Sequence, residues 1–185
     1  MILLKKNIAE LAMLLKDLDT CAPAIEKAVK TIKGVLKKNG KILIFGNGGS
    51  AADANHFAAE LVCRFEKNRK ALPAISLNTD TSVLTAIGND FAYKNIFARQ
   101  IEALGSGGDA VVAISTSGKS DNIVEACRIA QRKKIKIIAL TGMAGLRGGK
   151  TANAVIAVPS RKTARIQEAH ALILHTLCGL LENDM

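Results

Sequence analysis

Residues 41–50, Lys41-Ile-Leu-Ile-Phe-Gly-Asn-Gly-Gly-Ser50, decide the fold class of this 185-residue chain. Four apolar residues predict a short buried strand, a glycine-rich turn follows, and the stretch 50–65 carries apolar residues at helical spacing. The order strand, turn, helix is the unit of parallel sheets, because parallel strands need a long crossover connection. The segment therefore predicts an α/β fold.

The same order recurs along the chain. Apolar runs predict further strands at 74–77, 109–115, 136–141 and 154–158, helices after 79 and after 120, and a last helix at 163–182. Two helices precede the first strand, at 7–19 and 23–39. We predict an α/β fold with a doubly wound five-stranded parallel sheet flanked by helices and two N-terminal helices. A single domain spans 1–185, with N-terminal helices at 1–39 and the α/β core at 40–185.

The chain carries 26 Lys and Arg against 16 Asp and Glu, a net charge of +10, so its surface attracts anions. Only 3% of its residues are aromatic, which leaves few rings for nucleic acid bases to stack on and favours a phosphorylated small molecule as the partner. A basic cluster keeps nucleic-acid binding as an alternative: Arg128, Arg132, Lys133, Lys134 and Lys136. We interpret this cluster as a solvated helix end and expect no nucleic-acid partner.

The cysteines at 21, 63, 127 and 178 are widely spaced, which favours reduced thiols over a disulfide framework or a zinc ribbon. The apolar residues at 1–4 and 11–15 are each followed at once by a lysine, so neither a signal-peptide core nor a span of about 20 apolar residues is present. We expect a cytoplasmic protein that does not associate with a membrane.

Right-handed crossovers place the loops that follow the strands at one edge of the sheet, where ligands of such folds bind. The first loop, Gly46-Asn-Gly-Gly-Ser-Ala51, also fits the dinucleotide fingerprint. The acidic residue of that fingerprint belongs at the end of the second strand, whereas Glu66 here still lies at the end of the first helix. A purely structural turn is a further alternative, and we favour backbone N–H groups that contact a phosphate or sugar.

The loop 113–120, Ala-Ile-Ser-Thr-Ser-Gly-Lys-Ser, resembles a Walker A loop without its first glycine. It is too short to wrap a triphosphate, and no strand ends in a metal-binding Asp. Its hydroxyl groups suit one phosphate monoester; they belong to Ser115, Thr116, Ser117 and Ser120. The alternative is a helix cap with turn serines.

The histidines stand on two predicted helices. His56 and Glu60 are spaced i and i+4 after the glycine loop, so they reach a common point, and Gln167, His170 and His175 lie on the last helix. An ordinary surface contact is the alternative for a His–Glu pair, but this helix begins at the predicted ligand edge.

At these residues the chain resembles the phosphoheptose isomerases, members of the sugar-isomerase (SIS) fold group. The matching stretches lie within 40–182 and comprise 46–53 with 56–60, 85–91, 114–118 with Ser120, and 165–170 with His175. The resemblance implies a single SIS domain, a homotetramer, and an aldose-ketose isomerase that interconverts sedoheptulose 7-phosphate and D-glycero-D-manno-heptose 7-phosphate for heptose-containing surface glycans such as lipopolysaccharide.

The resemblance also implies roles for individual residues. Glu60 would be the catalytic base and His175 the acid. Zinc would be held by His56, Glu60, Gln167 and His175. The sugar phosphate would be contacted by Asn47, Gly48, Gly49, Glu60, Asn89, Asp90, Ser115, Thr116, Ser117, Ser120 and Gln167. Two positions depart from the family pattern: Lys119 stands where relatives often have Asn, and Ala164 where some have Asp.

The chemistry is consistent with these roles, since moving a carbonyl from C2 to C1 needs a base, an acid and stabilisation of an enediolate. A zinc-bound carboxylate is a weaker base than a free one, so whether zinc is catalytic or structural stays open. Gln167 and His175 stand about 12 Å apart along a straight helix, against zinc bonds of about 2 Å. We hypothesise a composite site with at least one residue from a neighbouring subunit.

A non-catalytic adaptor of the same fold, the protein that binds the bacterial replication initiator, is the alternative function. It lacks the glutamate and the final histidine, whereas this chain has both Glu60 and His175.

Overall fold

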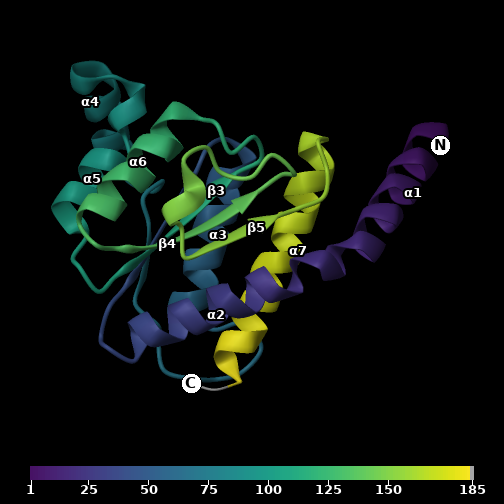
Figure 1. Ribbon diagram of the computed structural model, residues 1–185, viewed down its shortest axis with the longest axis horizontal. Coiled ribbons are helices and arrows are strands. Elements are labelled where there is room, and N and C mark those ends of the chain that lie inside the picture. The colour runs from purple at the N-terminus through teal and green to yellow at the C-terminus, as the bar shows by residue number, and fades with distance from the viewer. Residues whose placement is uncertain (184–185) are drawn as a thin grey trace.

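The computed structural model describes residues 1–183 and contains a five-stranded parallel sheet in the order β2-β1-β3-β4-β5 (Figure 1). The strands are β1 (Ile42–Gly46), β2 (Ala74–Ser76), β3 (Ala110–Ser115), β4 (Lys136–Thr141) and β5 (Ala154–Ala157). From β1 the chain adds β2 on one side and then β3, β4 and β5 on the other. The predicted doubly wound topology is confirmed.

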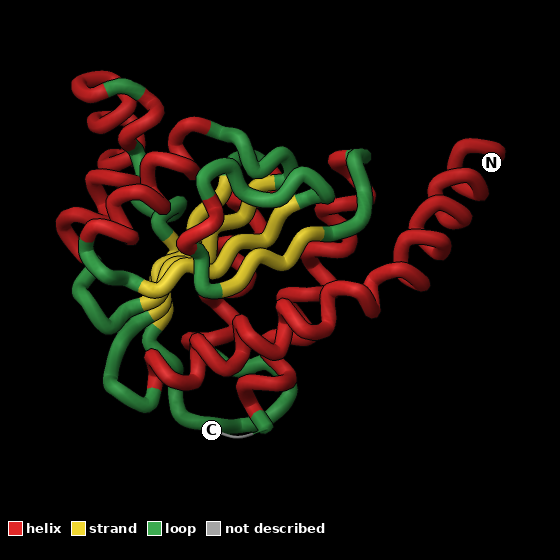
Figure 2. The backbone as a smooth tube through the Cα atoms, in the orientation of Figure 1, coloured by secondary structure: helices red, strands yellow, loops and turns green. Residues whose placement is uncertain are grey.

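Helices cover both faces of the sheet (Figure 2). They are α1 (Ile2–Asp17), α2 (Ala22–Leu36), α3 (Gly49–Val62), α4 (Thr81–Phe91), α5 (Ala98–Leu104), α6 (Asp121–Arg132) and α7 (Thr163–Glu182). The helices α2, α3 and α7 pack on one face, and α5 and α6 pack on the other.

Strand β1 shows why the central strands are continuous apolar runs. Ile42 and Ile44 belong to the core under α3 and α7, whereas Leu43 and Phe45 belong to the core under α5 and α6. All four side chains are fully buried. Successive side chains of a strand point to opposite faces, so a strand covered on both faces needs apolar residues at every position.

Some helix bounds differ from the sequence prediction. The first helix begins at Ile2 and ends at Asp17, with a short 3-10 turn (Leu18–Cys21) after it. Helix α2 ends at Leu36 instead of 39, since Asn39 has a positive φ of 59° that a helix does not accommodate. Helix α3 ends at Val62 instead of 65, and α5 was not predicted because seven residues are too few for a periodic pattern.

Helix α1 extends away from the rest of the molecule (Figure 1). Its exposed apolar side chains are Ile2, Leu3, Leu4, Ile8, Met13 and Leu15. An exposed apolar stripe of this kind is typical of a surface that contacts another molecule. Within residues 1–183 no helix is both long and apolar enough to cross a membrane.

Candidate functional site

The strand order reverses between β1 and β3, the place where ligands of doubly wound sheets bind. Two asparagine side chains join the loop after β1 to the first turn of α6: Asn47 donates to Asn122 at 2.9 Å, and Asn122 donates back to Asn47 at 2.8 Å. The Tyr93 hydroxyl donates to Asn47 Oδ1 at 3.2 Å. The glycine loop is therefore fixed to the start of α6.

Two glycines of this loop are required by its geometry. Gly48 has a positive φ of 55° and turns the chain into α3. A Cβ atom at Gly49 would collide with the side-chain amide of Gln167 on α7. The predicted substrate residues Asn47, Gly48, Gly49 and Gln167 thus lie together at the ligand edge.

Helices α3 and α7 leave this edge side by side and run in the same direction (Figure 1). About two turns along α3 and three turns along α7, His56 Nε2 and His175 Nε2 are 2.9 Å apart, and His56 Nε2 is 3.6 Å from Glu60 Oε1. Both imidazoles are exposed. The structure thus brings together the predicted base, the predicted acid and one further predicted zinc ligand within one chain.

The loop after β3 presents its hydroxyl groups at the same edge. Gly118 turns it with a positive φ of 63° and donates its N–H to Ser115 Oγ at 3.2 Å. Ser120 is the N-cap residue of α6, but its side chain makes no capping hydrogen bond. The side chain of Ser120 therefore does not act as the helix cap that was the alternative for it.

A cavity of about 210 Å³ opens beside this loop. Its polar lining residues are Thr116, Ser117, Lys119, Ser160, Arg161 and Thr163. Lys119 and Arg161 are both exposed. Hydroxyl groups and two cations around a small cavity are the chemistry that holds a phosphate.

Asn89 and Asp90 lie elsewhere, at the end of α4. Asn89 Nδ2 donates to Asp90 Oδ1 at 2.8 Å, and both side chains are exposed. Figure 1 shows α4 at the periphery, on the side of the sheet away from α7. Within one chain the structure does not bring this predicted pair to the α3–α7 histidines.

His170 is buried in the core and does not face this site. It is 0% exposed, and its Nε2 lies 3.2 Å from the Thr141 carbonyl oxygen at the end of β4. Burial lowers the pKa of His170 to about 4, against the weaker opposing effect of that hydrogen bond. This histidine supports the packing of α7 on the sheet.

Three features of the site were not predicted from the sequence. Asn122 pairs with Asn47, Phe65 stacks on the His175 ring, and Asp53 has one buried carboxylate oxygen without a hydrogen-bond partner among residues 1–183. Burial raises the pKa of the Asp53 carboxyl, while the nearby His56 opposes this shift. Only Asp53 had a sequence signal, because it precedes His56 by one helical turn.

The donor set at the histidine pair suits zinc in part. Two imidazole nitrogens and a carboxylate are ligand types that zinc takes, and nitrogens 2.9 Å apart can each lie about 2 Å from one ion. Among residues 1–183, no group of three or more His, Cys, Asp or Glu side chains is close enough to hold a metal ion. Gln167, two helical turns from His175, lies against Gly49 instead.

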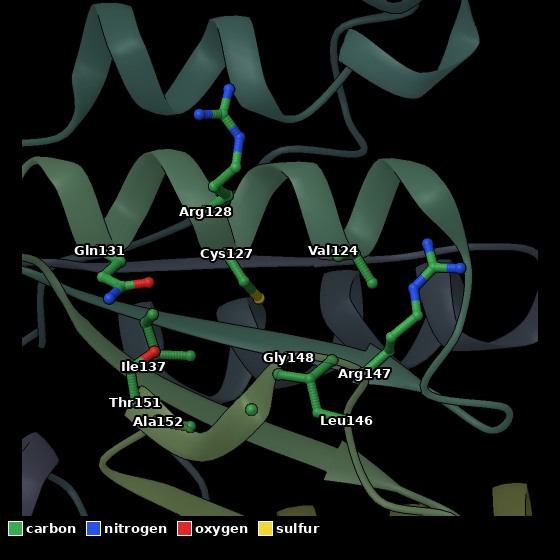
Figure 3. Close-up of a pocket in the computed structure, with 11 residues that line it drawn as sticks. Val124, Cys127, Arg128, Gln131, Ile137, Leu146, Arg147, Gly148, Thr151 and Ala152 are labelled. Carbon is green, nitrogen blue, oxygen red and sulfur yellow. The ribbon is translucent and has the colours of Figure 1, made fainter.

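A second cavity, of about 280 Å³, lies on the other face of the sheet between α6 and residues 146–152 (Figure 3). Apolar side chains and Cys127 line much of it. The guanidinium groups of Arg128 and Arg147 point away from its centre and pair with Glu125 and Asp121. Arg128, which belongs to the predicted basic cluster, is therefore paired with Glu125 and does not direct its charge into this cavity.

Comparisons with known proteins show the family to which the chain belongs. The SIS domain model matches residues 7–142. A phosphoheptose isomerase of Aliarcobacter butzleri is 46% identical over 99% of this chain and 97% of its own, and one of Campylobacter jejuni is 48% identical over 97% of both. The chain belongs to the phosphoheptose isomerase family. It is a sugar-phosphate isomerase, and the resemblance stated from its motifs is confirmed.

Solved structures of two members of the phosphoheptose isomerase family share the fold. The enzyme of Neisseria gonorrhoeae superposes with a TM-score of 0.88 at 39% identity, covering 97% of both chains. The enzyme of Francisella tularensis superposes with a TM-score of 0.90 at 37% identity, covering all of both chains. The SIS-type fold predicted for this isomerase is confirmed, including the two N-terminal helices.

Proposed function

We propose that this isomerase interconverts sedoheptulose 7-phosphate and D-glycero-D-manno-heptose 7-phosphate through an enediolate. The observation that carries the proposal is the cluster of Glu60, His56 and His175 on α3 and α7, the two helices that begin at the ligand edge of the sheet. A seven-carbon sugar phosphate has its carbonyl and its phosphate at opposite ends. A polar loop cavity and a separate acid-base cluster match that division.

The residues have distinct roles in this proposal. Glu60 removes a proton from C1 and returns it to C2, while His175 donates a proton to the carbonyl oxygen on C2 and takes one from the hydroxyl on C1. Asn47, Gly48, Gly49 and Gln167 hold the sugar hydroxyls. The phosphate is held by the hydroxyls of Ser115, Thr116, Ser117 and Ser120, with Lys119 and Arg161 adding positive charge beside them.

Zinc is the proposed cofactor, held by His56, Glu60 and His175, with Gln167, which lies against Gly49 in this structure, as the fourth proposed ligand. When bound, it would polarise the substrate oxygens and stabilise the negative charge of the enediolate. The two close imidazoles support this assignment.

We also propose a homotetramer with composite active sites. Two features support it: the exposed apolar stripe of α1, and the placement of Asn89 and Asp90 away from the histidine pair within one chain. A neighbouring copy would cover the stripe and bring its own Asn89 and Asp90 to the site. Sedimentation of the wild-type chain and of a Leu4→Lys/Ile8→Lys variant tests this, and a monomer with full activity would contradict it.

We propose that the enzyme acts in the cytoplasm and supplies heptose precursors for surface glycans such as lipopolysaccharide. The test is turnover of sedoheptulose 7-phosphate, with and without added zinc, by the wild type and by Glu60→Gln and His175→Gln. We expect turnover by the wild type and a much lower rate in both variants. No turnover under either condition would favour the non-catalytic adaptor of the replication initiator, and full activity of Glu60→Gln would remove the proposed base.

A further inference from the structure

The segment that joins α3 to β2, residues 63–73, passes the C-terminal end of α7 (Figure 1). It begins directly after the helix that carries His56 and Glu60. Helix α3 ends at Val62, three residues before the end predicted from the sequence. The conformation of this segment therefore influences both helices of the candidate site.

The Glu182 carboxylate in the last turn of α7 holds the start of this segment. It accepts three consecutive backbone N–H groups, from Phe65 at 2.8 Å, Glu66 at 3.0 Å and Lys67 at 2.9 Å. Its side chain is only 2% exposed. A buried carboxylate that accepts three main-chain hydrogen bonds fixes the backbone to which it is bonded.

Arg69 ties the same carboxylate to the end of α3. Its Nε lies 3.3 Å from Glu182 Oε1, and its side chain is 5% exposed. Its two terminal nitrogens donate to the carbonyl oxygens of Glu60 at 2.7 Å and Leu61 at 2.8 Å. One guanidinium thus satisfies backbone groups that the last turn of α3 leaves unpaired. It also fixes the backbone of the proposed catalytic base.

The consequence for the site is the position of Phe65. Its ring stacks on the His175 imidazole, with ring centroids 5.4 Å apart and planes 25° from parallel. The His175 Nε2 atom, on the same ring, lies 2.9 Å from His56 Nε2. An exposed histidine that is covered on one face by a fixed aromatic ring loses rotational freedom and keeps its nitrogen directed at its partner.

We propose that Phe65 is a positioning residue for His175, and that Glu182 and Arg69 hold Phe65 in place. This inference rests on the proposed function, since it requires His175 to take part in the reaction. It assigns a role to a segment that carries none of the predicted site residues. The inference requires an aromatic ring at position 65, because an aliphatic side chain does not stack on the imidazole.

The test compares Phe65→Leu, which removes the ring, with Phe65→Tyr, which keeps it. Stacked aromatic pairs contribute enough to change a rate by about tenfold. We expect Phe65→Leu to lower kcat about tenfold with little change in KM, and Phe65→Tyr to retain the wild-type kcat. Glu182→Gln, which keeps the shape of the carboxylate but not its charge, should lower kcat in the same direction.

A structural readout accompanies the kinetics. In NMR spectra, the His175 ring protons, assigned with His175→Gln, should show a ring-current shift in the wild type and Phe65→Tyr that is absent in Phe65→Leu. Loss of this shift with unchanged kcat would overturn the positioning role. An equal loss of kcat in Phe65→Leu and Phe65→Tyr would overturn it too. A wild type that shows the shift but turns over no sugar phosphate would instead overturn the proposed function.

Discussion

Two histidines five residues apart on α7 occupy opposite environments. His170 faces the sheet, is 0% exposed and is hydrogen-bonded to the Thr141 carbonyl oxygen. His175 faces α3, is exposed, and meets His56 and Phe65. Both lie in the stretch that resembles the family, so the motif alone does not distinguish them. The helix side on which each stands decides whether an imidazole stabilises the fold or can exchange a proton with a substrate.

The largest expected effect is on activity and concerns the exposed histidine. His175→Gln should lower kcat by roughly 10²- to 10⁴-fold, the usual contribution of an acid or base catalyst. Its midpoint of thermal unfolding should stay close to that of the wild type, because the replaced ring is exposed. Steady-state kinetics and a thermal melt of the same preparation check both statements.

The matched variant is His170→Leu, whose kcat should stay within a few-fold of the wild type. If His170→Leu lost as much activity as His175→Gln at an unchanged melting temperature, the division between a structural and a functional histidine would be wrong.

The sequence predicted the sheet well because its signal is local. Every residue of β1 and β3 is buried, and a strand covered on both faces must be apolar throughout. The glycine loop and the pair of His56 and Glu60 were also found, since a turn and one helical spacing define them. In each case the physical cause lies within a few neighbouring residues.

The contacts that complete the site were not predictable in this way. Phe65 stacks on His175, which lies 110 positions later in the sequence. This contact depends on the conformation of residues 63–73, which Glu182 and Arg69 hold in place. The pairing of Asn47 with Asn122 depends on the adjacency of β1 and β3, which spacing does not encode. His170 could be placed on the last helix, but its burial depended on how that helix packs on β4.

The second effect, intermediate in size, is on stability and concerns the buried histidine. The pKa of His170 is lowered from 6.5 to about 4 because burial disfavours its charged form. Above pH 6.5 neither the folded nor the unfolded chain protonates this residue. Between pH 6.5 and pH 4 the unfolded chain alone does, so the free energy of unfolding falls as the pH falls, by about 3 kcal/mol for this group.

Urea unfolding at pH 7 and at pH 4 measures this loss, with His170→Leu as the comparison. The variant should lose about 3 kcal/mol less than the wild type over this range. At pH 7 the two should be similar, because the Thr141 carbonyl oxygen keeps the N–H of Val158 as a partner and the variant removes a buried Nδ1 that has none. Equal losses in both proteins would show that His170 is not the buried neutral group described above.

The smallest expected effect concerns the two exposed cations, Lys119 and Arg161, that line the cavity beside the loop after β3. It extends the contrast between buried and exposed groups. Lys119→Asn combined with Arg161→Gln should raise KM for sedoheptulose 7-phosphate about fivefold at low salt, with kcat nearly unchanged, because exposed ion pairs contribute at most about 1 kcal/mol each. The difference should shrink at high salt, where exposed charges are screened.

Lys38→Asn combined with Arg132→Gln is the matched control, since it removes the same charge from exposed positions away from this cavity. An equal rise in KM in the control would mean that the net charge of +10 attracts the substrate as a whole and that the two loop cations have no special place. A rise confined to Lys119 and Arg161 would show that an exposed group contributes to function through its position, which is the role proposed for His175 on α7.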